Sequence, residues 1–191
     1  MSESKYNCDF IDVISDEMCE TELAGNGDQI YYCERKLVKN LPIDQAGNLN
    51  ADDFVTAVKG KLHQLDMHSD TVEGTGTVED DQTAGQSQLT GRCDKGEDKF
   101  RVFDRIARYK DIAYFAVSTT GKIRGYYSQN KKCRYSSSYT TGTEYNSDHG
   151  FTMTVTVPAT EFAYIGIDLN TQTAEEKATI DDLLQKNSAS S

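Results

Sequence analysis

The sequence lacks tryptophan, and its 191 residues include two prolines and three histidines. It also lacks any apolar run that approaches the ~20 residues of a membrane-spanning helix, so we expect no membrane partner. Residues 1–8 are polar and acidic, without the basic and apolar regions of a secretory signal peptide. We therefore expect the protein to be made, and at first kept, in a cytoplasm.

Sequence motifs for catalysis, metal binding or nucleotide binding are also missing. His63 and His68 lie five positions apart, which does not match the i, i+4 spacing of a helical metal pair. His149 stands in a polar stretch without a Ser or Cys signature for a nucleophile that it could activate. No Walker motif occurs, and Gly25 and Gly27 lack the third glycine of a dinucleotide-binding fingerprint. We predict no catalytic, metal-binding or cofactor-binding residues, no cofactor and no enzymatic activity.

Cysteine is present in an odd number and at wide, irregular spacing, which does not suit a disulfide framework or a zinc site. The five residues are Cys8, Cys19, Cys33, Cys93 and Cys133. We predict that they are free thiols, partly buried, and that they pack as small hydrophobic side chains.

Charge is sorted along the chain, whose net charge is −11. Residues 1–98 hold 21 acidic and 8 basic side chains, residues 99–135 hold 2 acidic and 10 basic, and residues 136–191 hold 8 acidic and 2 basic. Attraction between unlike surfaces sets a docking register, so we predict that the basic segment contacts another subunit. We call its ten basic residues the basic block, and we predict that all but Lys110 are interface residues: Lys99, Arg101, Arg105, Arg108, Lys110, Lys122, Arg124, Lys131, Lys132 and Arg134.

Tyrosines interleave with these basic residues, and this pattern has a second interpretation. Aromatic and basic side chains on a sheet can bind single-stranded nucleic acid. Tyrosine and arginine are also enriched at protein interfaces. Because the isoelectric point is near 4.7, we favour the protein interface over the nucleic-acid site. The tyrosines concerned are Tyr109, Tyr114, Tyr126, Tyr127, Tyr135 and Tyr139.

Apolar spacing and turn residues predict the secondary structure. Asn50 caps a predicted helix over 51–65, and Thr173 with Glu176 forms a capping box for a predicted C-terminal helix. The predicted strands are 30–38, one that begins at Phe100, a hairpin of 112–118 and 122–128, and strands 136–141, 151–157 and 164–169.

Residues 66–98 are acidic and polar, with few large apolar groups, so they cannot offset the entropy cost of ordering from a core of their own. We predict an extended loop or inter-subunit arm at 66–98. The fold class is then mainly β (α+β): a single domain over 1–191, with a β-sandwich or barrel, one internal helix, a long polar arm and a C-terminal helix.

This order of parts resembles phage tail-tube proteins and their relatives in contractile injection machines. The resemblance rests on the β-rich segment 100–169, the helix 51–65, the polar extension 66–98 and the acidic balance. The pattern over 19–37, in which a cysteine precedes a glycine-bearing turn and an Ile-Tyr-Tyr strand, resembles tail proteins of phages that infect Bacteroidetes. The resemblance implies hexameric rings that stack around an acidic channel, through which double-stranded DNA passes without specific binding. It carries over no site residue.

We therefore expect a self-assembling virion structural protein, assembled in the host cytoplasm, whose partners are itself and other tail or neck proteins. Candidates for the acidic wall of the channel are Glu73, Glu79, Asp80 and Asp81. A capsid or neck decoration protein, or a head-closure module, is the alternative. A nucleic-acid-binding β protein or a small hydrolase is less favoured.

Overall fold

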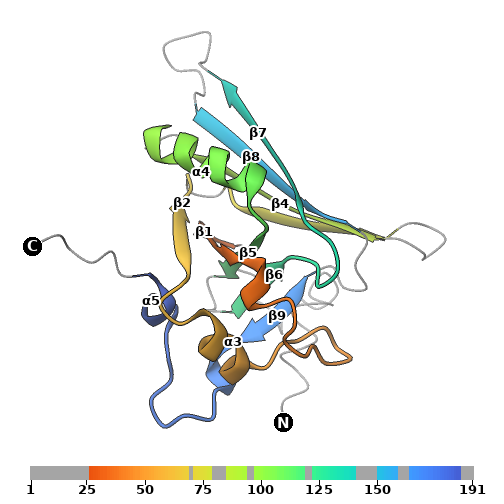
Figure 1. Cartoon of the computed structure of the whole chain (residues 1–191), viewed down its shortest axis with the longest axis vertical. Coiled ribbons are helices and arrows are strands. Elements are labelled where there is room, and N and C mark those ends of the chain that lie inside the picture. Colours follow the sequence, from red (N-terminus) through yellow and green to blue (C-terminus); the bar gives the residue numbers. More distant parts are fainter. Residues whose placement is uncertain are drawn as a thin grey trace, which may run out of the picture.

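The computed structural model describes residues 26–68, 71–78, 85–93, 97–118, 122–140, 150–158 and 164–185. Within these ranges the chain forms two antiparallel sheets and three α-helices, which confirms the mainly β (α+β) fold class (Figure 1). The five-stranded sheet lies below the four-stranded sheet in this view, with α3 and α5 at the lower end and α4 beside β7 and β8.

The elements have the following bounds. The five-stranded sheet has the order β2 (His63–Asp66), β1 (Asn26–Glu34), β5 (Ile112–Ser118), β6 (Lys122–Tyr126), β9 (Ile165–Asp168). The four-stranded sheet has the order β3 (Glu73–Val78), β4 (Gly85–Cys93), β8 (Gly150–Val157), β7 (Arg134–Thr140). The helices are α3 (Ala51–Val58), α4 (Glu97–Tyr109) and α5 (Ile180–Leu183), with 3₁₀ turns η1 (Arg35–Leu37) and η2 (Leu169–Thr171).

Strand β5, at the centre of the five-stranded sheet, is buried on both faces, which explains its apolar run over 112–117. On one face, Phe54 of α3 packs edge-on against Phe115, with ring centroids 5.3 Å apart. On the other face, Ile30 of β1 meets β4 at Gly91, where an added Cβ would lie 2.9 Å from Ile30 Cδ1. A glycine in β4 thus lets the two sheets approach closely.

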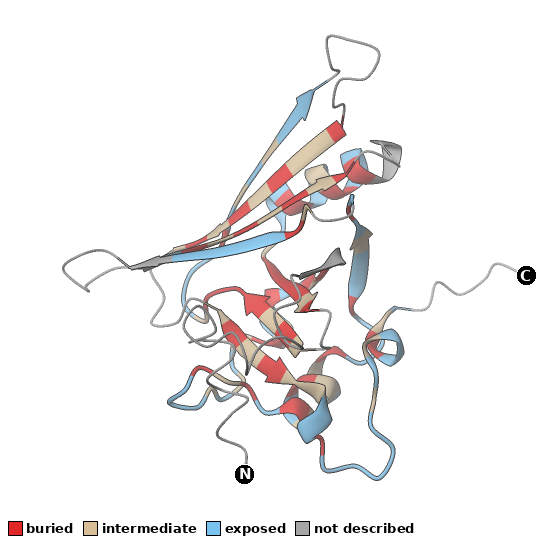
Figure 2. Ribbon diagram, turned by 180° about the vertical axis from the view of Figure 1, so that it is seen from behind, coloured by how far each residue is buried: buried red, intermediate tan, exposed pale blue. Residues whose placement is uncertain are grey.

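The four-stranded sheet has one buried face and one polar face. Met153, Val155 and Val157 of β8 are buried, while the threonines between them are partly exposed (Figure 2). The alternation predicted for 151–157 is confirmed, as is the pairing of β5 with β6. The predicted strands 136–141 and 164–169 correspond to β7 and β9.

The predicted strand at Phe100 is wrong, because residues 97–109 form helix α4. Phe100, Phe103 and Ala107 are buried at i, i+3 and i+7, the spacing of one helical face. Val102, which a strand would place on the same face as Phe100, is 54% exposed. The segment therefore buries its aromatic residues through helical rather than alternating spacing.

The helix predicted over 51–65 is shorter than expected. The side chain of Asn50 accepts hydrogen bonds from the backbone N–H groups of Asp52 and Asp53, so the predicted N-cap is confirmed. α3 ends at Val58, and Gly60 has a φ of +69°, in the left-handed region that favours glycine. Residues 63–66 then form β2.

Most of the described residues in 66–98 form strands β3 and β4, so the predicted extended loop is wrong for them, while the alternative of an inter-subunit arm stays a prediction. β3 and β4 pair in antiparallel register, and β4 pairs on its other side with β8. Leu89 is fully buried and Val72 is 8% exposed. Leu89 and Val72 are buried in the core shared by both sheets. The segment is therefore ordered by this common core and not by a separate one.

The C-terminal helix also differs from its prediction. Thr173 does not cap a helix, because its backbone N–H and its hydroxyl donate hydrogen bonds to Asp52 of α3. The capping box lies instead at Thr179 and Asp182, and the helix it begins, α5, is four residues long. The predicted strand 30–38 likewise ends at Glu34, where η1 begins.

Candidate interaction surfaces

The inner face of α4 is held by aromatic contacts to both sheets. Phe100 stacks on Phe151 of β8, with ring centroids 4.7 Å apart. Phe103 contacts Tyr32 of β1 at 4.9 Å and Tyr135 of β7 at 5.8 Å between ring centroids. Such pairs add to the stability gained from burial and fix the rotation of the helix about its axis.

Asp104 is the polar anchor of the same helix. Its carboxylate accepts hydrogen bonds from Arg108 Nε at 2.9 Å, from the Tyr135 hydroxyl at 3.0 Å and from the Ser137 hydroxyl. Burial raises the pKa of Asp104, but the hydrogen bonds from Ser137, Arg108 and Tyr135 outweigh burial and hold that pKa below its usual value. The helix is therefore attached to β7 by polar as well as aromatic contacts.

An exposed apolar strip runs along the opposite side of α4. Val102, Ile106 and Tyr109 are 54%, 38% and 81% exposed. Their i, i+4, i+7 spacing places them in one line, and the same spacing places Arg101 and Arg105 in a row beside them. We call these five residues the α4 outer face; Figure 2 shows the exposed side of α4 in pale blue.

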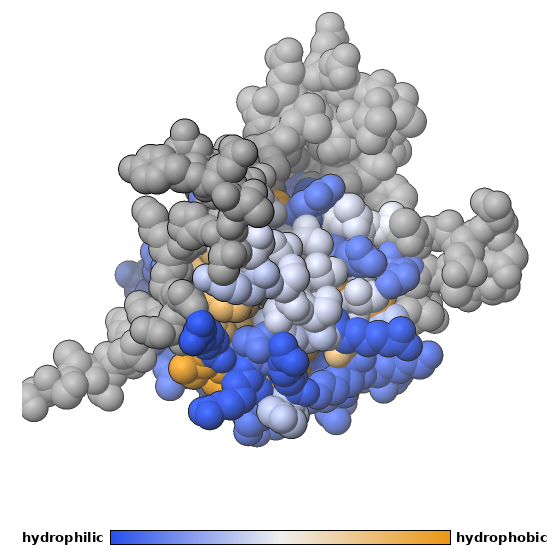
Figure 3. Space-filling model, turned by 90° about the horizontal axis from the view of Figure 1, so that it is seen from above, coloured by the Kyte–Doolittle hydropathy of each residue, from blue (hydrophilic) through white to orange (hydrophobic). Residues whose placement is uncertain are grey.

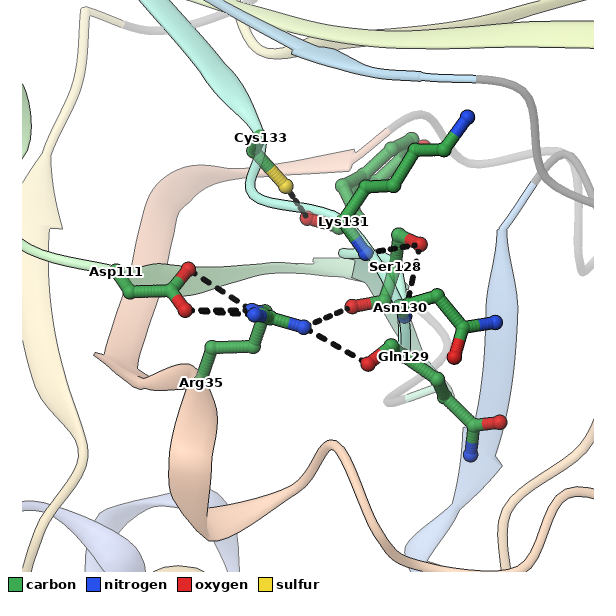
Figure 4. A network of polar contacts seen from close by, with 8 residues as sticks. Arg35, Asp111, Ser128, Gln129, Asn130, Lys131 and Cys133 are labelled. Carbon is green, nitrogen blue, oxygen red and sulfur yellow. Dashed lines mark hydrogen bonds and ion pairs between the residues drawn. The ribbon is translucent and has the colours of Figure 1, made fainter.

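Arg35 fixes the chain segments around the C-terminal end of α4 (Figure 4). Its Nε lies 2.8 Å and 2.9 Å from the two carboxylate oxygens of Asp111, and its Nη2 lies 2.7 Å from Oδ2. Its Nη1 donates to the carbonyls of Ser128 and Gln129, each at 2.9 Å. Arg35 is 8% exposed, and it joins the end of β1, the α4–β5 link and the segment after β6. We assign this network a structural role, because Arg35 is buried and its hydrogen bonds join three segments of the chain.

The basic block does not form one sheet edge. Arg101, Arg105, Arg108 and Lys110 are exposed on or just after α4; Lys122 and Arg124 are partly buried on β6; Lys131, Lys132 and Arg134 are exposed between β6 and the start of β7. Arg124 lies over the ring of Tyr164, 5.3 Å from its centroid. The side chain of Lys99 lies outside the described residues. The basic block is therefore divided among a helix, a strand and a connecting segment, and its role as a subunit interface stays a prediction.

The four-stranded sheet has two regular edges, β3 and β7. β7 pairs with β8 over seven consecutive positions and β3 pairs with β4 over six, without a bulge. After Glu73 and Arg134, the first residue of each strand, neither carries a charged side chain. Sheet edges are usually blunted by charge, proline or bulges. These two strands lack such features within their described spans.

The polar face of this sheet is built from threonine, serine and glutamine. Cross-strand partners share a face, so the register gives two rows: Glu73, Thr90, Thr154, Ser136, and Thr75, Gln88, Thr156, Arg134. Arg92 lies on the same face. Seen from above, the described surface is mostly hydrophilic or near neutral, with small hydrophobic areas (Figure 3).

The described part of this face carries one glutamate and two arginines, so it is not acidic. The acidic channel wall stays a prediction. Glu73 lies on this face and is exposed. Glu79, Asp80 and Asp81 lie outside the described residues, so their placement stays a prediction.

The three described cysteines, Cys33, Cys93 and Cys133, are buried thiols outside any disulfide, as predicted. Burial raises the pKa of Cys33 to about 12 and that of Cys133 to about 11, so both thiols are protonated at neutral pH. Cys8 and Cys19 lie outside the described residues. Their state stays a prediction.

The described histidines are not grouped with other metal ligands. His63 stacks on Tyr32 with ring centroids 5.0 Å apart, and burial lowers its pKa. Within the described ranges, no group of three or more His, Cys, Asp or Glu side chains could hold a metal ion. No helix in that part of the chain is long and apolar enough to cross a bilayer. His149 lies outside the described residues.

The α4 outer face was missed by the sequence reasoning, although the sequence carries a signal for it. Phe100, Phe103 and Ala107 share one helical spacing, while Val102 and Ile106 share another. Two apolar lines at helical spacing predict a helix with one buried side and one exposed side.

Comparison of the chain with protein-family models, with curated proteins and with solved structures finds no match.

Proposed function

We propose that this chain is a self-assembling virion structural subunit, which forms a tail tube of stacked hexameric rings and assembles in the host cytoplasm. The observation that carries the proposal is the pair of regular, nearly uncharged edges of the four-stranded sheet. An edge of this kind accepts a further strand through main-chain hydrogen bonds. Two different edges on one sheet give the heterologous contact that a ring requires.

The direction of the strands supports pairing of β7 with β3 of the next subunit. All neighbouring pairs in the sheet are antiparallel, and the sheet has four strands, so β3 and β7 run in opposite directions. A second subunit placed beside the first in the same orientation therefore presents its β3 antiparallel to β7. The sheet continues from subunit to subunit without turning either molecule over.

The position of the five-stranded sheet decides which face would line the channel. It lies on the apolar side of the four-stranded sheet. In a closed ring the bulkier layer takes the larger outer circumference, so the Thr/Ser/Gln face turns toward the channel. Binding to DNA without sequence preference needs many Lys and Arg side chains, and this face carries two arginines and one glutamate among its described residues. A nearly neutral wall suits passage of DNA without specific binding.

The experiment is electron microscopy of the purified protein, together with a pair of matched variants. Ser136→Lys/Ser138→Lys adds two charges to edge strand β7, and Thr152→Lys/Thr154→Lys adds the same charges to the same face of the neighbouring central strand. We expect rings or tubes from the natural protein and from the central-strand variant, but not from the edge variant. Monodisperse monomers of the natural protein at all concentrations would overturn the proposal.

The α4 outer face favours a second candidate function, a decoration or head-closure module that binds another virion protein. An exposed apolar strip beside arginines has the residue types that are enriched at protein interfaces. Such a module would remain monomeric alone and would join purified capsid or neck particles. Sedimentation of the protein with such particles, compared with the protein alone, distinguishes this function from self-assembly.

A further inference from the structure

The α4 outer face leaves three large apolar side chains uncovered within the described part of the chain. Val102, Ile106 and Tyr109 stand in one line, and no other described large hydrophobic except Tyr139 is comparably exposed. On the inner face of the same helix, Phe100, Phe103 and Asp104 contact residues of both sheets. The strip is therefore not needed to hold α4 on the body.

The charge beside this strip selects an acidic occupant. Residues 101–110 hold four basic side chains and one acidic side chain, Asp104. Asp104 is already bonded to Arg108 and β7. An occupant that matches this surface must combine carboxylates with apolar groups at close spacing.

Residues 9–23 of this chain have that composition. They hold six carboxylates and the apolar residues Phe10, Ile11, Val13, Ile14, Met18 and Leu23. The acidic segment 175–182 is a poorer match, because Ala178 and Ile180 already pack against the core of their own chain.

We propose that residues 9–23 of a neighbouring copy cover the α4 outer face. This inference rests on the self-assembly proposed above and names a second contact that strengthens it. The apolar side chains of the segment would cover Val102, Ile106 and Tyr109, and its carboxylates would face Arg101 and Arg105. The contact differs from β7–β3 pairing, so a subunit would be held by two independent surfaces.

The exit point of the segment favours a neighbouring copy over its own α4. Asn26, the first described residue, pairs with Ser118 at the last position of β5. α4 leads instead into the first position of β5, at Ile112. The segment therefore leaves the body at the far end of β1 and β5 from the C-terminal end of α4. Only residues 24 and 25 separate the segment from Asn26, a span of at most about 11 Å. The segment therefore covers an α4 that lies close to this end of β1 in the assembly, which is that of an adjacent copy.

Charge exchange in the full-length protein tests the proposal. The first variant is Arg101→Glu/Arg105→Glu, and the second is Asp12→Lys/Asp16→Lys. Each makes both partners of the contact alike in charge, so each alone should weaken association by at least about tenfold in analytical ultracentrifugation. Lys59→Glu/Lys61→Glu changes charge by the same amount at exposed positions after α3 and should have little effect.

Mixing the two variants distinguishes a neighbouring copy from the same chain. In an equimolar mixture, the acidic segment of the first variant can meet the arginines of the second. The lysine-bearing segment of the second can likewise meet the glutamates of the first. We therefore expect association to return. If association returns only when all four substitutions are in one chain, the segment docks on its own α4 and the proposal is wrong. If the natural protein assembles but neither variant weakens it, the proposal fails while the function stands. If the natural protein never assembles, both fail.

Discussion

The hydroxyl of Tyr135 on β7 lies 3.0 Å from the carboxylate of Asp104 on α4, to which it donates a hydrogen bond. Asp104→Ala removes the carboxylate that accepts hydrogen bonds from Tyr135, Ser137 and Arg108. We expect the free energy of unfolding in urea to fall by about 1–3 kcal/mol. Asp53→Ala, at an exposed position in the first turn of α3, should cost a few tenths of a kcal/mol by comparison. Equal losses in both variants would contradict this role for Asp104.

The same carboxylate should make stability depend on pH. The pKa of Asp104 in the folded protein is below its usual value of 3.8, so its contribution is present above that value and is lost as pH falls through the folded pKa. Asp104→Asn lacks this titration. The difference in unfolding free energy between the natural protein and Asp104→Asn should therefore be largest at neutral pH and should shrink below about pH 4. A difference that stays constant from pH 7 to pH 3 would show that Asp104 does not titrate in this way.

Substitution of Tyr127 should raise the free energy of unfolding, whereas substitution of Asp104 should lower it. The buried hydroxyl of Tyr127 has no hydrogen-bond partner among the described residues, and burial raises its pKa. Tyr127→Phe removes an unsatisfied polar group, so we expect it to stabilise the protein by up to about 1 kcal/mol. Tyr135→Phe is the matched control, because it removes a hydroxyl that is bonded and should destabilise. Thermal or urea unfolding of both variants is the measurement, and destabilisation by Tyr127→Phe would disprove the expectation.

The buried thiols should be protected from chemical labelling. In a Cys8→Ser/Cys19→Ser variant, the remaining thiols are those of Cys33, Cys93 and Cys133. Because burial raises the pKa of Cys33 and Cys133, we expect slow reaction with a thiol reagent at pH 8 and rapid reaction in denaturant. Mass spectrometry counts the labelled sites. Rapid labelling of Cys33 or Cys133 in the native protein would contradict their burial.

The strands with a clear period could be predicted from the sequence, because each buries a defined face. β8 alternates strictly between threonine and apolar residues over 151–157, and β5 is apolar over 112–117 because α3 and the second sheet cover both its faces. The cap at Asn50 could also be predicted, because it depends on local backbone hydrogen bonds. These features depend on short stretches of sequence.

The features that the sequence reasoning missed depend on distant partners. β3 and β4 hold few apolar residues, and they are ordered because β4 lies between β3 and β8. The sequence of α4 also fits a short apolar strand, because Phe100, Val102 and Phe103 lie close together in it. Its contacts with Tyr32 and Tyr135 select the helix. The basic block could therefore be recognised in the sequence, but its division among α4, β6 and the start of β7 could not.

The order of strands in the four-stranded sheet has a consequence for synthesis. β8 lies between β4 and β7, but it is made after both of them. While a ribosome is still producing the chain, β4 and β7 lack the strand that joins them until residue 157 has emerged. The sheet that carries both proposed contact edges therefore forms only after β8 has been synthesised. A nascent chain that ends before β8 cannot present that sheet to an assembly, so the fold itself would delay the proposed self-assembly until residues 150–157 have been made.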